Sequence, residues 1–184
     1  MNLNEYQKLA ITTKIYDDSV AIPYVVLGIV GESAELYAKV TEKLDGGDVD
    51  LGLLGKECAD VVWYLAAWAD ENGLLLKDLI IENLTYEHVM VDLKRDLQAL
   101  VMYSGQIAEY SKKARRDDFE DISKGIYPAS KMAKTNEAVA NLYRATSFIA
   151  GSFGLAMQDL LIENVEKLKS RAERGVLGGS GDKR

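Results

Sequence analysis

The chain is poor in cysteine, histidine and proline, and each shortage excludes a class of protein. It has one cysteine, one histidine and two prolines among 184 residues. A single cysteine cannot form an internal disulfide, so Cys58 is expected to be a small core residue in a protein of a reducing compartment. With one cysteine and one histidine, a Cys/His nucleophilic mechanism has little support. Few prolines and 48% hydrophobic residues favour a globular, helical chain.

Positive charge and long apolar runs are also scarce. The net charge of −7 argues against a nucleic-acid surface, which would be basic. The longest uninterrupted apolar run, residues 61–69, is too short to cross a bilayer, and the N-terminus has no signal-peptide pattern. The sequence contains no Walker A motif, no glycine-rich dinucleotide motif and no nucleophilic triad. We therefore expect a cytoplasmic protein that binds neither nucleic acid nor a membrane.

Apolar residues recur with helical periodicity along the whole chain, and no convincing strand alternation is found. The pattern predicts a first helix ending near residues 17–19, a second over about 23–44, a third over 53–72 and a fourth over 76 to about 88. Gly73 is suited to end the third helix. The length fits one compact domain. The predicted fold class is all-α, a helical bundle.

The second half of the chain repeats the first. Residues 73–84 (GLLLKDLIIENL) return as residues 154–165 (GLAMQDLLIENV), with seven of the twelve positions identical. Upstream, residues 31–35 align with 105–109, so the offset grows from 74 to 81 residues, and a surface loop around residues 117–129 accounts for the difference. Chance similarity between amphipathic helices is the alternative. We predict two tandem, divergent repeats, about 1–88 and about 89–175 with a tail over 176–184, that pack as a pseudo-dimer.

Two carboxylate pairs stand out in the first repeat. Glu32 and Glu35, and then Glu57 and Asp60, are each three positions apart within otherwise apolar sequence. On a helix this spacing places both acids of a pair on one face. Four carboxylates near a core repel one another and need a counter-charge, which a hard cation such as Mg²⁺, or Mn²⁺ in its place, would supply. Four solvated surface acids are the alternative.

The second repeat lacks most of these acids. Gln106 stands opposite Glu32, and the remaining counterparts are Glu109, Ala138 and Asn141. Only Glu109 is still acidic. The sequence therefore predicts one acidic quartet per chain, with the second half as a scaffold.

The motifs resemble those of the MazG-like, all-α nucleoside triphosphate pyrophosphohydrolases, whose relatives include the dimeric dUTPases and phosphoribosyl-ATP pyrophosphohydrolase. The first half carries most of the resemblance, in residues 28–35 (GIVGESAE) with Lys39, and residues 56–65 (KECADVVWYL). Two further stretches look like the family's first helix and its closing motif: Glu5-Tyr6-Gln7 with Thr12-Thr13, and residues 164–171 (NVEKLKSR) with Arg174-Gly175 and residues 179–184 (GSGDKR).

This resemblance implies a helical bundle that binds Mg²⁺ through Glu32, Glu35, Glu57 and Asp60. The expected reaction cleaves a nucleoside triphosphate between its α and β phosphates, giving a monophosphate and pyrophosphate. Glu35 or Glu57 could serve instead as general base for the attacking water. Proteins of this kind are usually dimers of four-helix units, so the chain is expected to be a homodimer or a monomer with an internal pseudo-dimer. A dUTPase-like or phosphoribosyl-ATP enzyme, and a non-catalytic nucleotide-binding helical module, are the alternatives.

Several residues are candidates for substrate contact. The resemblance implies that Lys167 and Arg171 bind the triphosphate; the alternative is an exposed basic helix face paired with Glu163 or Glu166. Lys39 follows Glu35 by one turn and could hold a phosphate or pair with that glutamate.

Three further positions have two interpretations each. Asn83 and Asn164, expected at the ends of equivalent helices, could contact sugar or phosphate or simply cap those helices. Trp63 could stack on the base or belong to the core. Arg184 would meet phosphate if the glycine-rich tail folds over the nucleotide; otherwise the tail is a disordered end.

Overall fold

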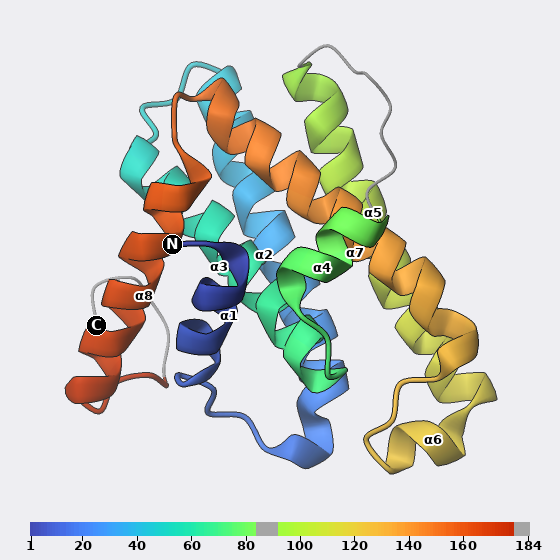
Figure 1. Cartoon of the computed structure of the whole chain (residues 1–184). Helices are drawn as coiled ribbons and strands as arrows, with labels where there is room; N and C mark the ends of the chain where they lie inside the picture. The colour runs from blue at the N-terminus through green and yellow to red at the C-terminus, as the bar shows by residue number, and fades with distance from the viewer. Residues whose placement is uncertain (84–91, 179–184) are drawn as a thin grey trace.

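The computed structural model describes residues 1–83 and 92–178, and within them the chain is helical with no strand. This confirms the predicted all-α class. The elements are α1 (Leu3–Ile11), a 3₁₀ turn η1 (Asp18–Val20), α2 (Ala21–Leu44), α3 (Leu51–Glu71), α4 (Leu76–Asn83), α5 (Leu93–Asp117), α6 (Phe119–Ser123), α7 (Ala129–Ser152) and α8 (Met157–Glu173) (Figure 1).

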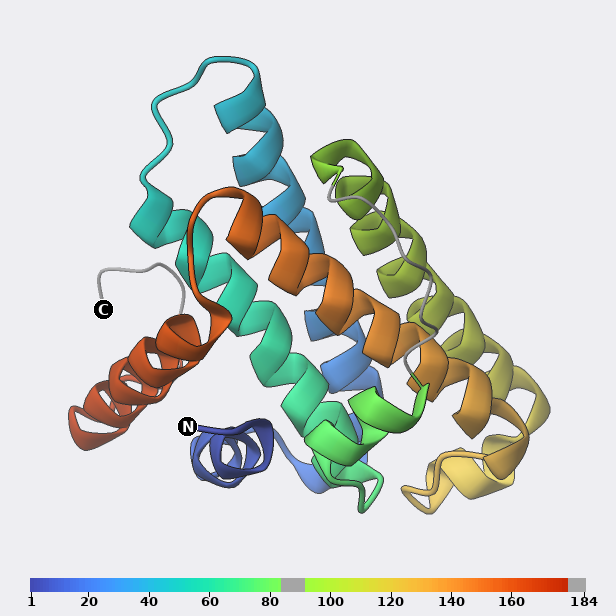
Figure 2. The same ribbon diagram turned by 45° about the horizontal axis from the view of Figure 1, so that its top comes forward.

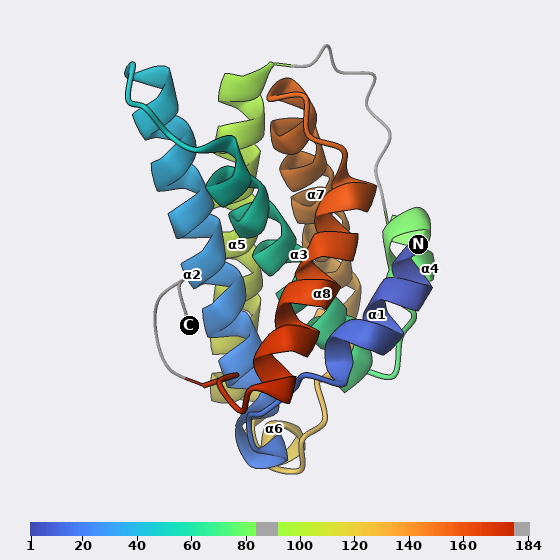
Figure 3. The same ribbon diagram turned by 90° about the vertical axis from the view of Figure 1, so that its left-hand side faces the viewer.

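Four long helices form the centre of the bundle. The most extensive packing joins α5 to α7 and α2 to α3, and α2 also contacts α5. Helices α1 and α8 lie against α3, while α4 lies against α7 (Figures 2 and 3). The largest fully buried side chains come from all four central helices and from α1 and α4: Trp68, Tyr6, Ile29, Leu36, Leu54, Leu65, Leu76, Leu100, Ile107, Leu142, Ile149 and Val25. Packing of these side chains holds α2 and α3 side by side.

Local sequence signals explain where several helices begin and end. The Asn2 side chain accepts hydrogen bonds from the first turn of α1 and forms a capping box with Glu5. The side chains of Asp50 and Asp92 accept hydrogen bonds from the backbone N–H groups of the second residues of α3 and α5, Gly52 and Lys94. After α3 and α7 the chain reverses at Gly73 and Gly154, whose φ angles of 66° and 73° favour glycine.

The helices follow the register of the predicted repeat. Helices α3 and α7 end 81 residues apart, as α4 and α8 begin 81 residues apart. The same hydrogen bond closes both helix ends, from Leu74 N–H to Ala69 O at 2.8 Å and from Leu155 N–H to Ala150 O at 3.0 Å. Each short helix packs on the other half, α4 on α7 and α8 on α3. A pseudo-dimer of two repeats would have this exchange of helices, but duplication of the chain stays a prediction.

The structure differs from the expected elements in four places. The first helix, predicted to end near residues 17–19, ends at Ile11, and a separate 3₁₀ turn covers Asp18–Val20. The loop predicted around residues 117–129 contains α6. Helix α4 ends at Asn83 within the described residues; the rest of the predicted fourth helix, to about residue 88, lies outside them. Asn164 does not end a helix, because α8 continues to Glu173. It therefore presents its side chain to a neighbouring helix rather than capping its own.

One helical stretch among the described residues, Asp18–Leu44, is long and apolar enough to cross a membrane, and the bent pair α7 and α8 passes the same criterion if taken as one span. Core helices of globular proteins share this composition, and here α2 packs on α3 and α5. The expectation that the chain binds no membrane stays a prediction.

A close contact between α2 and α3 gives a stability prediction. An ideal Cβ on Gly28 would overlap the Tyr64 ring, whereas one on Gly31 would meet no atom within 4 Å. We expect Gly28→Ala to lower the free energy of unfolding by about 1–3 kcal/mol, as overpacking does. Gly31→Ala on the same helix should raise it by up to about 1 kcal/mol. Urea unfolding of both variants measures this, and equal stabilities would contradict the contact.

Candidate metal site and adjoining cavity

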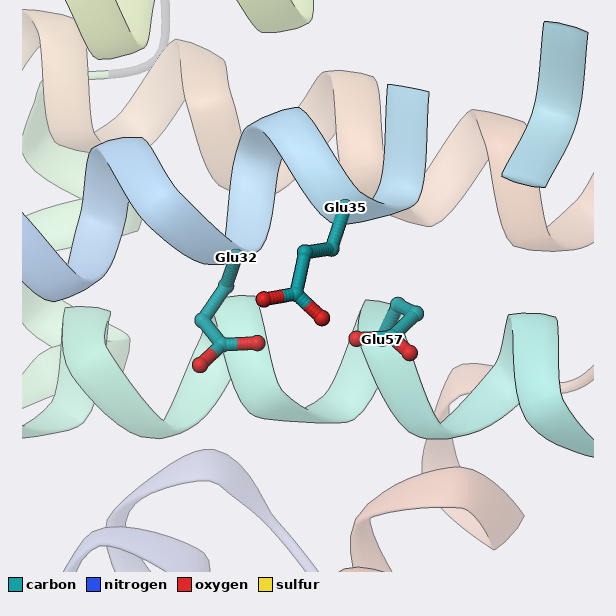
Figure 4. A group of neighbouring side chains, drawn as sticks. All are labelled: Glu32, Glu35 and Glu57. Atoms are coloured by element: carbon teal, nitrogen blue, oxygen red, sulfur yellow. The ribbon is translucent and has the colours of Figure 1, made fainter. Parts of the chain in front are cut away.

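Three glutamates from two helices meet at one point. Glu32 and Glu35 lie on the same face of α2, and Glu57 lies opposite them on α3 (Figure 4). Each offers a carboxylate oxygen, and these oxygens all lie within 4.8 Å of one another. Glu57 is buried, Glu32 is half-buried and Glu35 is exposed. Three of the four predicted acids therefore converge, with one side open to solvent.

Burial raises the pKa of two of the three glutamates. Burial, and then the charges of Asp60, Glu35 and Glu57, raise the pKa of Glu32 to about 8. Burial also raises the pKa of Glu57, although Lys39 opposes that shift. Clustered carboxylate oxygens of this kind are the ligands that Mg²⁺ and Mn²⁺ prefer. The donor set therefore fits a hard divalent cation.

Lys39 has a different partner from the one expected. Its Nζ atom lies 3.3 Å from Glu57 Oε1, across the α2–α3 contact. The predicted pair with Glu35 is therefore replaced by a pair with Glu57, because the buried glutamate has the greater need of a counter-charge. The phosphate role of Lys39 stays a prediction.

Asp60 does not join the three glutamates. Lys167 Nζ on α8 donates to both of its carboxylate oxygens, at 2.7 and 2.8 Å, and Asn164 Nδ2 donates to Oδ1 at 2.7 Å. Three of the four predicted acids thus face one another, and the fourth is compensated by the second half of the chain; the role of Asp60 as a metal ligand stays a prediction. The Lys167 ammonium group compensates the charge of the half-buried Asp60 carboxylate. A position among the three glutamates would instead place it beside like charges that repel it.

A buried tyrosine from the first helix orients this contact. Tyr6 Oη donates to Asn164 Oδ1 at 3.0 Å, which leaves the Asn164 NH₂ group facing Asp60. Burial, and secondarily the charge of Asp60, raise the pKa of Tyr6 well above its usual value, so the hydroxyl keeps its proton. Sequence reasoning did not name Tyr6 as a site residue. The sequence feature that could have indicated its role is its place in the Glu5-Tyr6-Gln7 motif.

A cavity of about 430 Å³ opens beside Glu32 and Asp60. The Trp63 indole is fixed there, since Nε1 donates to Ala10 O at 3.2 Å and to Thr13 Oγ1 at 3.3 Å. Trp63 is half-buried, so it is neither a core residue nor fully open. The other walls come from the chain between α1 and α2, from α2, α3 and α8, and from the chain after α8: Thr13, Ile15, Tyr16, Tyr24, Tyr64, Leu168, Arg171, Leu177 and Gly178.

The aromatic side chains of the cavity pack on one another. The rings of Tyr16 and Tyr24 have centroids 4.7 Å apart, and those of Trp63 and Tyr64 are 4.9 Å apart, nearly perpendicular. Sequence reasoning missed Tyr16 and Tyr24, which carry no motif and become neighbours only in the folded chain. The result is a rigid aromatic wall next to an acidic cluster.

Two basic residues of α8, Lys167 and Arg171, lie on its inner face. Lys167 and Arg171 border a smaller cleft of about 160 Å³ between α3 and α8, and Arg171 borders the larger cavity too. Arg171 is buried and the Lys167 side chain is 16% exposed. The alternative of an exposed basic face paired with Glu163 or Glu166 is therefore wrong for Lys167, whose partner is Asp60.

Two predicted site residues are not brought to this region. The Asn83 amide donates to Leu79 O within its own helix at 2.8 Å, and Asn83 borders neither cavity. Its contact with substrate is not supported by this placement. Arg184 lies outside the described residues, although Leu177 and Gly178 of the same tail line the larger cavity. Cys58 is fully buried, as expected for a core residue.

Comparisons of the chain with protein families, with curated proteins and with solved structures give no match. The resemblance to the MazG-like pyrophosphohydrolases therefore rests on the motifs quoted above.

The raised pKa of Glu32 predicts how stability changes with pH. Its folded pKa of about 8 lies above its ordinary value of 4.5, so the folded state holds more protons than the unfolded state between these two values. In chelated buffer, stability should fall as the pH rises through this window. Mg²⁺ should restore stability at the high end, where the carboxylates are ionised.

Thermal unfolding from about pH 5 to pH 8 measures this effect in the native protein and in Glu32→Gln. The variant should show a flatter pH dependence, since it has lost the titrating group. Parallel pH profiles for the two proteins would contradict the assignment.

Proposed function

We propose that the protein is a Mg²⁺-dependent nucleoside triphosphate pyrophosphohydrolase that converts a (d)NTP to a (d)NMP and pyrophosphate. The observation that carries the proposal is the convergence of three carboxylates within 4.8 Å beside an aromatic-walled cavity. That cavity, at about 430 Å³, has the size of a small-ligand pocket. Acids for a cation and aromatic rings for a base are the two components that a nucleotide site needs.

Glu32, Glu35 and Glu57 are the residues that would hold the cation. A bound Mg²⁺ would neutralise phosphate charge and lower the pKa of water there. Among the described residues Glu35 has no ion-pair partner, whereas Glu57 is paired with Lys39. This difference supports Glu35 over Glu57 as the general base, because Glu35 is open to the solvent water that it would activate, whereas Glu57 is buried and held by Lys39.

Residues of α8 and α3 would bind the rest of the nucleotide. Arg171, which borders both cavities, can make paired hydrogen bonds to phosphate oxygens, and Lys167 supplies a point charge. Trp63, held by Ala10 and Thr13, presents a fixed ring for stacking on a base. The dUTPase-like and phosphoribosyl-ATP alternatives share this chemistry and differ in the base that the aromatic wall accepts.

Release of pyrophosphate from a panel of NTPs and dNTPs with Mg²⁺ tests the function. Glu35→Gln should lower kcat/KM by roughly 10²- to 10⁴-fold, as loss of a general base does. The matched control is Glu109→Gln, which alters the corresponding acid of the second half; that acid is ion-paired with Lys112 and Lys113. It should leave activity within about twofold of the native protein, because surface substitutions away from a site have small effects.

Absence of turnover for every nucleotide in the panel would contradict the proposal and favour the non-catalytic nucleotide-binding module. Equal losses in Glu35→Gln and Glu109→Gln would contradict the placement of the site in the first half.

A further inference from the structure

Asp60 lies one turn along α3 from Glu57, yet its charge is satisfied by another helix. We propose that the Asp60–Lys167 pair is a latch that the triphosphate opens: phosphate draws Lys167 away, and Asp60 then faces the cation as a fourth carboxylate. This inference rests on the proposed function. It differs from a fixed four-acid site, because the fourth acid becomes available only when substrate is present.

The two carboxylate oxygens of Asp60 accept different numbers of hydrogen bonds. Oδ1 accepts from both Asn164, at 2.7 Å, and Lys167, at 2.7 Å, whereas Oδ2 accepts from Lys167 alone, at 2.8 Å. Departure of Lys167 therefore leaves Oδ1 hydrogen-bonded and Oδ2 without its donor. Tyr6 fixes the Asn164 amide, so this remaining bond is held by a buried, oriented group. Asp60 can change partner without losing its position.

Asp60 lies close enough to the three glutamates for a change of its partner to affect cation binding. It borders the larger cavity together with Glu32. Among the charges that act on Glu32, that of Asp60 contributes most, so the two carboxylates are within electrostatic reach of each other. Without Lys167, the site would hold a fourth uncompensated carboxylate beside three that already repel one another.

Lys167 is suited to be the moving part. Its ammonium is a point charge on a flexible stem, and its side chain is still 16% exposed at the edge of the α3–α8 cleft. A triphosphate carries more negative charge than a single carboxylate and competes for the same ammonium. Such an exchange makes nucleotide and cation binding cooperative, and the coupling must be reciprocal.

Titration with Mn²⁺, followed by the electron paramagnetic resonance signal of the free ion, tests the latch without nucleotide or turnover. Lys167→Met should free Asp60 and tighten Mn²⁺ binding by roughly tenfold, within the usual range of coupling between sites. Lys169→Met, which removes a charge from an exposed position of the same helix, should change the affinity less than about twofold. Asp60→Asn alone should have a similarly small effect, since Asp60 is held by Lys167 in that state.

The double variant Asp60→Asn with Lys167→Met should return to the native affinity. A non-hydrolysable triphosphate with a bridging nitrogen between its α and β phosphates should tighten Mn²⁺ binding in the native protein and much less in Lys167→Met. Unchanged affinity in Lys167→Met, or a loss in Asp60→Asn as large as in Glu57→Gln, would overturn the latch. Failure of the native protein to bind Mn²⁺ at all would instead contradict the metal site itself.

Discussion

Repulsion among Glu32, Glu35 and Glu57 is the constraint on which the rest of the site depends. Packing of α2 on α3 brings their oxygens within 4.8 Å of one another, partly out of water. Like charges at this distance shift protonation or demand a cation. The contact of Lys39 with Glu57 offsets part of this repulsion, and burial together with the neighbouring carboxylates raises the pKa of Glu32. A hard divalent cation would be the complete one.

The two halves of the chain contribute opposite charges to this region. The three clustered acids come from α2 and α3, and Lys167 and Arg171 come from α8, which packs more extensively on α3 than on α7 of its own half. At the corresponding places of the second half, Asn141 stands for Asp60 and Ala138 for Glu57. There Glu109 is compensated by neighbouring lysines on its own helix. The first half thus clusters its acids, whereas the corresponding positions of the second half are neutral or ion-paired.

The sequence predicted what depends on spacing within one helix. The position of the long helices, the shared face of Glu32 and Glu35, and the buried place of Cys58 follow from periodicity and residue type. Pairings between helices could not be predicted in this way. The partners of Lys39 and Asp60 depend on how α2, α3 and α8 are packed, which no local pattern records.

The cavity illustrates the same limit. Tyr16 lies in the turn after α1 and Tyr24 lies on α2, and neither belongs to a recognisable motif. They become a wall only because that turn returns to the Trp63 face of α3. For Asn164 a sequence pattern gave the wrong expectation. Its position in the repeat suggested a helix end, but α8 continues past it and its amide donates a hydrogen bond to Asp60.

The central claim is that the three glutamates form a divalent cation site that the fold builds. Anomalous diffraction from a crystal grown with Mn²⁺ tests it most directly. The account predicts one strong anomalous peak between the carboxylates of Glu32, Glu35 and Glu57, lost in Glu57→Gln. A peak elsewhere, or none between these side chains, would contradict it.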